Sequence, residues 1–107
     1  MADELSKAKK NIIALADIKP TNKKIINVLK DLNNQDREIK IINSCQENYG
    51  LNAIYKPHDL HAFIIDDSKL LLGINKDSEY NLAVLNNQHL IEAFKTYFDK
   101  NWNSNYE

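Results

Sequence analysis

The chain has 107 residues, of which 43% are hydrophobic and 27% are charged, with few glycines and prolines. This length and composition predict one globular domain over 1–107 with its own core, and they argue against long linkers and disorder. The chain has fourteen basic and fifteen acidic side chains, for a net charge of −1. We therefore do not expect nucleic-acid binding by this domain, because that function usually needs an excess of positive charge.

The sequence also indicates where the protein would reside. Cys45 is the single cysteine, so no disulfide can form within one chain, which fits a reducing compartment. The start lacks an apolar signal region, and no run approaches the ~18 apolar residues of a membrane span. We expect a cytoplasmic protein without membrane contact, and the chain could be a fragment of a longer one.

The first half of the sequence predicts a strand, a helix and a second strand. A helical turn at 3–10 precedes a continuous apolar run at 11–17, typical of a strand that is covered on both faces. A turn at 20–22 offers helix-capping residues, and the following helix should end near Asn34. Alternation over 38–43 predicts the second strand, parallel to the first. The helix should bury Ile25, Val28, Leu29 and Leu32.

The second half predicts four more strands and a final helix. The strands are expected at 51–56, 61–66, 69–74 and 80–85. Asp66, Asp67 and Ser68 have the composition of a hairpin turn. Asn86 or Asn87 can cap a last helix that extends to about Trp102 and has a broad apolar face. The whole pattern is that of an α/β domain.

The stretch 61–75, with the sequence HAFIIDDSKLLLGIN, resembles the motif region of the phospholipase D-like superfamily. In that pattern His-x-Lys precedes a short apolar stretch, an Asp-rich hairpin turn and an apolar strand that ends near Gly-Ser. A βαβ unit before the stretch, and a strand and an aromatic helix after it, agree with this context. The resemblance implies a phospholipase D-like half-domain, with a βαβ unit followed by β-hairpins and a C-terminal helix, and helices packed on a mixed sheet.

The residues that would carry the family's chemistry depart from the pattern. By resemblance, His61 would attack phosphorus, and a lysine two residues later would hold the phosphate on the same strand face. That second position is Phe63, which has no charge to stabilise the developing phosphorane. Asp66 also follows His61 too closely, and Gly73 is followed by isoleucine. We therefore assign no catalytic residue, and the resemblance implies a sensor or effector-binding role such as degenerate domains have in archaeal TrmB-like regulators.

His61 is the residue that the sequence singles out as lining a ligand pocket. His58, Tyr55 and Asn75 could share the same site by analogy of fold. The alternative for His61 is a partly buried histidine that a backbone group satisfies. The histidines and aspartates between 58 and 67 could suit zinc chemically, but no motif spacing supports a metal site, and we predict no metal and no cofactor.

Three hypotheses follow. The first is a non-catalytic ligand-sensing or dimerisation domain, such as the regulatory part of a transcription regulator or signalling protein, with a small-molecule ligand and a homodimer or companion domain as partner. The second is a phosphodiesterase or nuclease that uses His61 or His58 with a metal ion. The third is a protein-interaction module whose contact face is the C-terminal helix.

Overall fold

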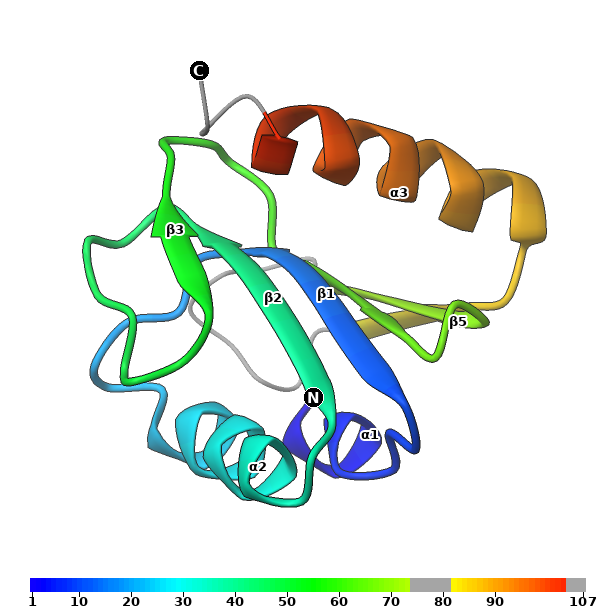
Figure 1. Cartoon of the computed structure of the whole chain (residues 1–107). Coiled ribbons are helices and arrows are strands. Elements are labelled where there is room, and N and C mark those ends of the chain that lie inside the picture. The colour runs from blue at the N-terminus through cyan, green and yellow to red at the C-terminus, as the bar shows by residue number, and fades with distance from the viewer. Residues whose placement is uncertain (74–81, 104–107) are drawn as a thin grey trace.

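The structure, a computed structural model, describes residues 1–73 and 82–103, and Figure 1 shows how its elements are arranged. They follow the chain in the order α1 (Ala2–Leu5), β1 (Asn11–Ala16), α2 (Lys23–Asn34), β2 (Glu38–Asn43), β3 (Ala53–Tyr55), β4 (Ala62–Ile65), β5 (Lys69–Gly73), β6 (Leu82–Leu85) and α3 (Gln88–Asn103).

The strands form one mixed sheet in the order β3-β2-β1-β4-β5-β6. β1 pairs with β2, and β2 with β3, in parallel. β4 lies antiparallel to β1, and β5 and β6 continue the sheet in antiparallel fashion. The predicted βαβ unit, the hairpin and the mixed sheet are therefore confirmed.

Helices cover both faces of this sheet (Figure 1). α1 and α2 lie on one face, where they enclose a core that includes Leu5, Leu29 and Phe63. α3 lies on the other face and packs Phe98 and Trp102 against the sheet. Successive side chains of a strand point to opposite faces of the sheet, so each strand contributes to both cores. In β4, Phe63 points towards α1 and α2, and Ala62 and Ile64 point towards α3.

Three predicted elements differ in extent. The helical turn expected at 3–10 ends at Leu5, because the backbone N–H groups of Lys9 and Lys10 donate to the Asp66 carboxylate instead of to helical carbonyls. The strand expected at 51–56 is reduced to β3, since Leu51 closes a turn onto the Asn48 carbonyl. The strand expected at 80–85 is seen as β6, and its first two residues lie outside the described part.

The other predicted bounds agree closely. α2 ends at Asn34, β2 spans 38–43 as expected, and α3 starts after Asn87, whose side chain accepts a hydrogen bond from the Leu90 N–H at 3.1 Å. α2 buries Ile26 in addition to the predicted face, and Val28 is only half-buried. Within the described residues, no helix has the length and apolar character needed to cross a membrane.

Candidate functional site

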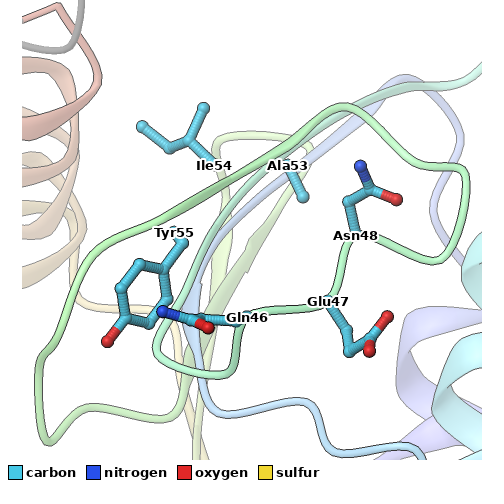
Figure 2. Close-up of a pocket in the computed structure, with 6 residues that line it drawn as sticks. All are labelled: Gln46, Glu47, Asn48, Ala53, Ile54 and Tyr55. Atoms are coloured by element: carbon cyan, nitrogen blue, oxygen red, sulfur yellow. The ribbon is translucent and has the colours of Figure 1, made fainter.

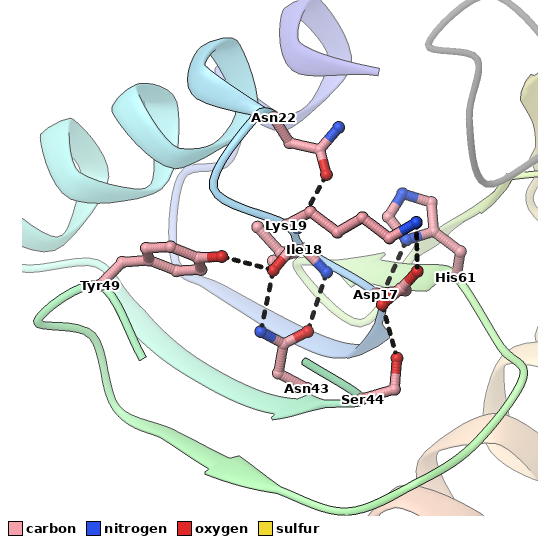
Figure 3. Close-up of polar contacts among 8 residues, drawn as sticks. All are labelled: Asp17, Ile18, Lys19, Asn22, Asn43, Ser44, Tyr49 and His61. Carbon is pink, nitrogen blue, oxygen red and sulfur yellow. Dashed lines mark hydrogen bonds and ion pairs between the residues drawn. The ribbon is translucent and has the colours of Figure 1, made fainter. Parts of the chain in front are cut away.

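A cluster of polar side chains lies at the edge of the sheet where the parallel strands end. Asp17 directly follows β1, and Ser44 directly follows β2. β4 runs antiparallel to β1, so His61, which precedes β4, lies beside the same end of β1 (Figure 3). Open α/β sheets bind their ligands at this edge, outside the carboxyl ends of parallel strands.

Two of the contacts that hold His61 in place involve its ring. Its Nδ1 accepts a hydrogen bond from the Asp17 backbone N–H at 3.1 Å. Its ring meets the Phe63 ring edge to face, with centroids 5.2 Å apart and planes at 88°. Only 7% of the residue is exposed. Because Nδ1 accepts a hydrogen bond, the neutral imidazole carries its proton on Nε2.

Asp17 joins this histidine to two further polar groups. Its carboxylate accepts a hydrogen bond from the Ser44 hydroxyl at 2.8 Å and pairs with the Lys19 ammonium at 3.7 Å (Figure 3). An imidazole, a carboxylate, a hydroxyl and an ammonium therefore gather around one residue. We call Asp17, Lys19, Ser44 and His61 the Asp17–His61 cluster.

The loops that carry the cluster are fixed by a buried amide. The Asn43 side chain accepts from the Ile18 N–H at 2.8 Å and donates to the Ile18 carbonyl at 3.1 Å and the Glu47 carbonyl at 3.0 Å. The Tyr49 hydroxyl donates to the same Ile18 carbonyl at 2.6 Å. Burial, chiefly, raises the pKa of Tyr49 above its usual range, so the phenol remains a donor. The loops after β1 and β2 are thereby tied together (Figure 3).

Gly73 makes room for the imidazole. It ends β5, and its N–H donates to the His61 carbonyl at 2.8 Å. A Cβ atom at position 73 would lie 2.7 Å from His61 Cδ2, closer than real Cβ atoms approach other heavy atoms. The glycine of the predicted motif therefore has a steric role next to His61.

Two of the other predicted ligand-binding residues, His58 and Tyr55, make their contacts elsewhere than at the His61 ring. Both ring nitrogens of His58 are engaged, since Nε2 lies 3.0 Å from the Ile42 carbonyl and Nδ1 accepts from the Leu60 N–H at 3.1 Å. Tyr55 lines a different cavity, on β3 and the loop after β2 (Figure 2). Asn75 lies outside the described residues. A ligand-binding role for these residues, and for His61, stays a prediction.

Phe63 is fully buried in the core under α1 and α2. It lies on the same strand face as His61, as alternation predicted, and contacts its ring. The position at which the resemblance calls for a lysine is therefore packed with hydrocarbon, and β4 itself contains no charged residue.

The two aspartates of the hairpin are used within the fold. Asp66 accepts hydrogen bonds from the backbone N–H groups of Lys9, Lys10 and Asn11 at 2.7–3.1 Å. Asp67 pairs with Lys95 of α3 at 3.2 Å. Across residues 1–73 and 82–103, no three His, Cys, Asp or Glu side chains come together as a metal-binding group.

Sequence reasoning missed Asp17, Lys19 and Ser44. A signal for them was present, since Asp17 and Ser44 directly follow the two strands predicted to be parallel. Parallel strands place their carboxyl ends together, so polar residues at those two positions are candidates to meet. The contribution of His61 from an antiparallel strand could not be paired with them until the strand order was known.

Comparison with solved structures shows which known fold the chain shares. No protein-family profile matches the sequence, and no curated protein matches it significantly. Among solved structures, Nuc of Salmonella typhimurium, a phospholipase D family member, superposes with a TM-score of 0.71 at 15% identity, over 95% of this chain and 84% of Nuc. NucT of Helicobacter pylori gives 0.70 at 17% identity, over 92% and 82%.

A third structure is TrmBL2, an archaeal chromatin protein with a novel mode of DNA binding. It superposes with a TM-score of 0.63 at 15% identity, over 96% of this chain but 46% of TrmBL2. Identities this low establish the shape of the domain and leave its chemistry open. With its mixed six-stranded sheet and C-terminal helix, the chain has the fold of the phospholipase D family members, as the motif pattern predicted.

Proposed function

We propose that this chain is a non-catalytic ligand-sensing or dimerisation domain of phospholipase D-like fold. The observation that carries the proposal is the buried phenyl ring of Phe63 beside His61. Phosphoryl transfer requires positive charge placed where negative charge develops, and a buried hydrocarbon supplies none. The chain keeps the phospholipase D-like fold, but Phe63 fills the strand face that would hold the phosphate.

The Asp17–His61 cluster supports a role in binding. It offers one cation, one carboxylate, a hydroxyl and an imidazole within a network of hydrogen bonds at 2.8–3.1 Å and an ion pair at 3.7 Å. Groups of both signs suit a small polar ligand that both donates and accepts hydrogen bonds. Because Asn43 and Tyr49 already fix the two loops, binding would not have to order them.

In such a role the domain would be one part of a regulator or signalling protein. This chain spans less than half of TrmBL2, which is described as binding DNA. The net charge of −1 does not favour DNA contact by the domain itself. In a regulator, DNA binding would therefore be done by other residues.

A thermal-shift screen tests the proposal. The panel holds sugars, phosphate esters, nucleotides, amino acids and divalent metals, and a ligand at 100 times its dissociation constant stabilises a protein by ~2.7 kcal/mol. We expect a stabilising ligand whose effect is lost in His61→Ala and retained in His89→Ala, a control because His89 is exposed on α3. Phosphodiester hydrolysis by the wild type that is abolished in His61→Ala would contradict a non-catalytic role, and metal dependence would favour the hydrolase.

Light scattering after size exclusion gives the second readout. A dimer fits the dimerisation form of the proposal. A monomer that none of the panel compounds stabilises would contradict both forms and leave the interaction module. For that module α3 is the expected contact face, since Leu90 and Tyr97 are exposed on it.

A further inference from the structure

The two outermost strands of the sheet, β3 and β6, differ in how their edges are protected. Edge strands carry backbone groups that could pair with another chain, and proteins protect them with brevity, charge or proline. β3 has three residues and is followed by Lys56 and Pro57, so it has all of these protections. β6 has the sequence Leu-Ala-Val-Leu and is followed by two asparagines, without a charge or a proline. The β6 edge is therefore the one suited to further pairing.

The hydrogen bonds of the hairpin determine which backbone groups of β5 are directed to β6. In an antiparallel sheet, residues that bond to one neighbouring strand alternate with residues that bond to the other. The Gly73 N–H donates to the His61 carbonyl at 2.8 Å, so Gly73 and the alternate residues before it bond to β4. Leu70 and Leu72 lie between them and therefore direct their backbone groups to β6.

The same alternation continues along β6. Its residues Ala83 and Leu85 lie opposite those two leucines and accept the pairing with β5. The N–H and carbonyl groups of Leu82 and Val84 consequently point away from β5, towards the outer side of the sheet. Each of these two residues presents one donor and one acceptor there.

The side chains of Leu82 and Val84 add an apolar surface beside this edge. Val84 is 49% exposed, the largest value among the exposed large hydrophobic side chains of residues 1–73 and 82–103. Leu82 lies on the same face by alternation and is half-buried against the core under α1 and α2. An exposed aliphatic side chain next to outward backbone groups is the combination that lets an edge strand associate.

We infer that β6 pairs antiparallel with β6 of a second copy of this chain, about a two-fold axis at Ala83, so that the two sheets become one. In this register Leu82 of each copy lies opposite Val84 of the other, and the two residues exchange their outward hydrogen bonds. The Val84 side chain is then covered by Leu82 of the other copy. The inference rests on the dimerisation form of the proposed function and gives that form its interface.

Symmetry and charge favour a second copy as the occupant of this edge. Antiparallel pairing of a strand with itself is closed, so it uses up the edge and gives a dimer instead of a filament. No charged residue lies between Leu82 and Asn87, so no like charges would face each other across the axis. The edges that remain are the two protected β3 strands. Because the interface is small, the dimer should be reversible and depend on concentration.

Amide hydrogen exchange of the whole chain, followed by NMR in dilute and concentrated samples, tests this pairing without a substitution. We expect the Leu82 and Val84 N–H groups to exchange rapidly in the dilute sample and to become protected in the concentrated one. The Ala83 and Leu85 N–H groups should be protected in both samples, because they bond to β5. Light scattering after size exclusion should show the dimer at the concentration at which the protection appears.

Substitutions at Val84 separate pairing from folding. Val84→Pro removes an N–H that β5 does not use, and edge strands tolerate proline at such positions. We expect this variant to stay folded in urea denaturation and to lose the dimer. Val84→Lys should also lose the dimer, because it places an ammonium against Leu82 of the other copy, and it replaces the proline variant if that variant is unfolded. Tyr97→Lys is the matched control, since Tyr97 is 48% exposed on α3, and should leave the dimer intact.

The outcomes distinguish this inference from the proposed function. A dimer that persists in both Val84 variants, or in which the Leu82 and Val84 N–H groups stay unprotected, would overturn the pairing of β6 and leave dimerisation through another surface. Loss of the dimer in Tyr97→Lys would do the same and would point to α3. A wild type that is monomeric at every concentration would overturn both this inference and the dimerisation form, whereas ligand sensing would still be decided by the thermal-shift screen.

Discussion

Gly73 leaves space for the His61 ring because it has no side chain. The His61 ring lies against it and is held from its other sides by Phe63 and by the Asp17 N–H. A ring fixed in this way cannot move aside without loss of a contact. The glycine is therefore required by the histidine beside it.

We expect Gly73→Ala to displace His61. The new methyl group would overlap Cδ2, so the variant should be less stable by about 1–3 kcal/mol and should lose the hydrogen bond to Asp17. Urea denaturation measures the first effect, and the NMR shift of the Asp17 amide measures the second. Gly50→Ala is the matched control, because no atom lies within 4 Å of its Cβ position and its cost is only backbone strain. An unchanged Asp17 amide in Gly73→Ala would refute this steric role.

Phe63 permits a second test at the residue scale. Phe63→Lys would bury an ammonium in hydrocarbon and remove the contact with His61, at a cost of about 3–5 kcal/mol. Phe63→Leu keeps the site apolar and should cost about half as much. Denaturant titrations of both variants compare these costs. If Phe63→Lys were as stable as the wild type, or gained phosphodiesterase activity, the strand face would be able to hold a phosphate after all.

At the scale of elements, the β4–β5 hairpin depends on its two aspartates. Asp66 and Asp67 have φ angles of 53° and 57°, the left-handed conformation that the tightest hairpin turns require. Aspartate tolerates it better than most residues. The sequence predicted this turn, but the second use of Asp66, as the acceptor for three N–H groups more than 50 residues away, needed the tertiary structure.

The same residue makes stability depend on pH. Burial raises the pKa of Asp66, but its backbone hydrogen bonds from Lys9, Lys10 and Asn11 outweigh burial, so the pKa lies below its usual value. A group whose pKa is lower in the folded state stabilises the fold above its unfolded pKa of about 3.9, and the stabilisation is lost as pH falls through the folded value.

Asp66→Asn should therefore have a smaller loss of stability on acidification than the wild type. Urea midpoints between about pH 6 and pH 2 measure the two slopes. Asp3→Asn, at an exposed position of α1, provides the control for a generic charge change. Parallel curves for the wild type and Asp66→Asn would show that the carboxylate does not contribute in this way.

At the scale of the whole molecule, the order of elements could be read from the sequence because it depends on local patterns. Apolar runs, the amphipathic helix at 23–34 and the Asp-Asp turn each signal their own structure. The Asp17–His61 cluster could be predicted only in part. His61 was marked by the motif, whereas Lys19 and Ser44 join it only through the order of the strands.

The cavity beside β3 was outside the reach of sequence reasoning for a different reason. By analogy of fold Tyr55 is predicted to share the His61 site, whereas in the structure it lines the cavity beside β3. The loop after β2 turns back over β3 through positive φ angles at Tyr49 and Gly50. A non-glycine residue in that conformation has no clear signal in one sequence.

The pairing of β1 with β4 has a consequence for how the chain folds. β1 is fastened at its start, where Asp66 accepts from Lys9, Lys10 and Asn11, and at its end, where His61 accepts from Asp17. A slip by one residue would break both fastenings and turn every side chain of β1 to the wrong face. The Asp66 and His61 side chains therefore favour the correct register of β1 against β4, because a misaligned pairing loses the hydrogen bonds at both ends of β1.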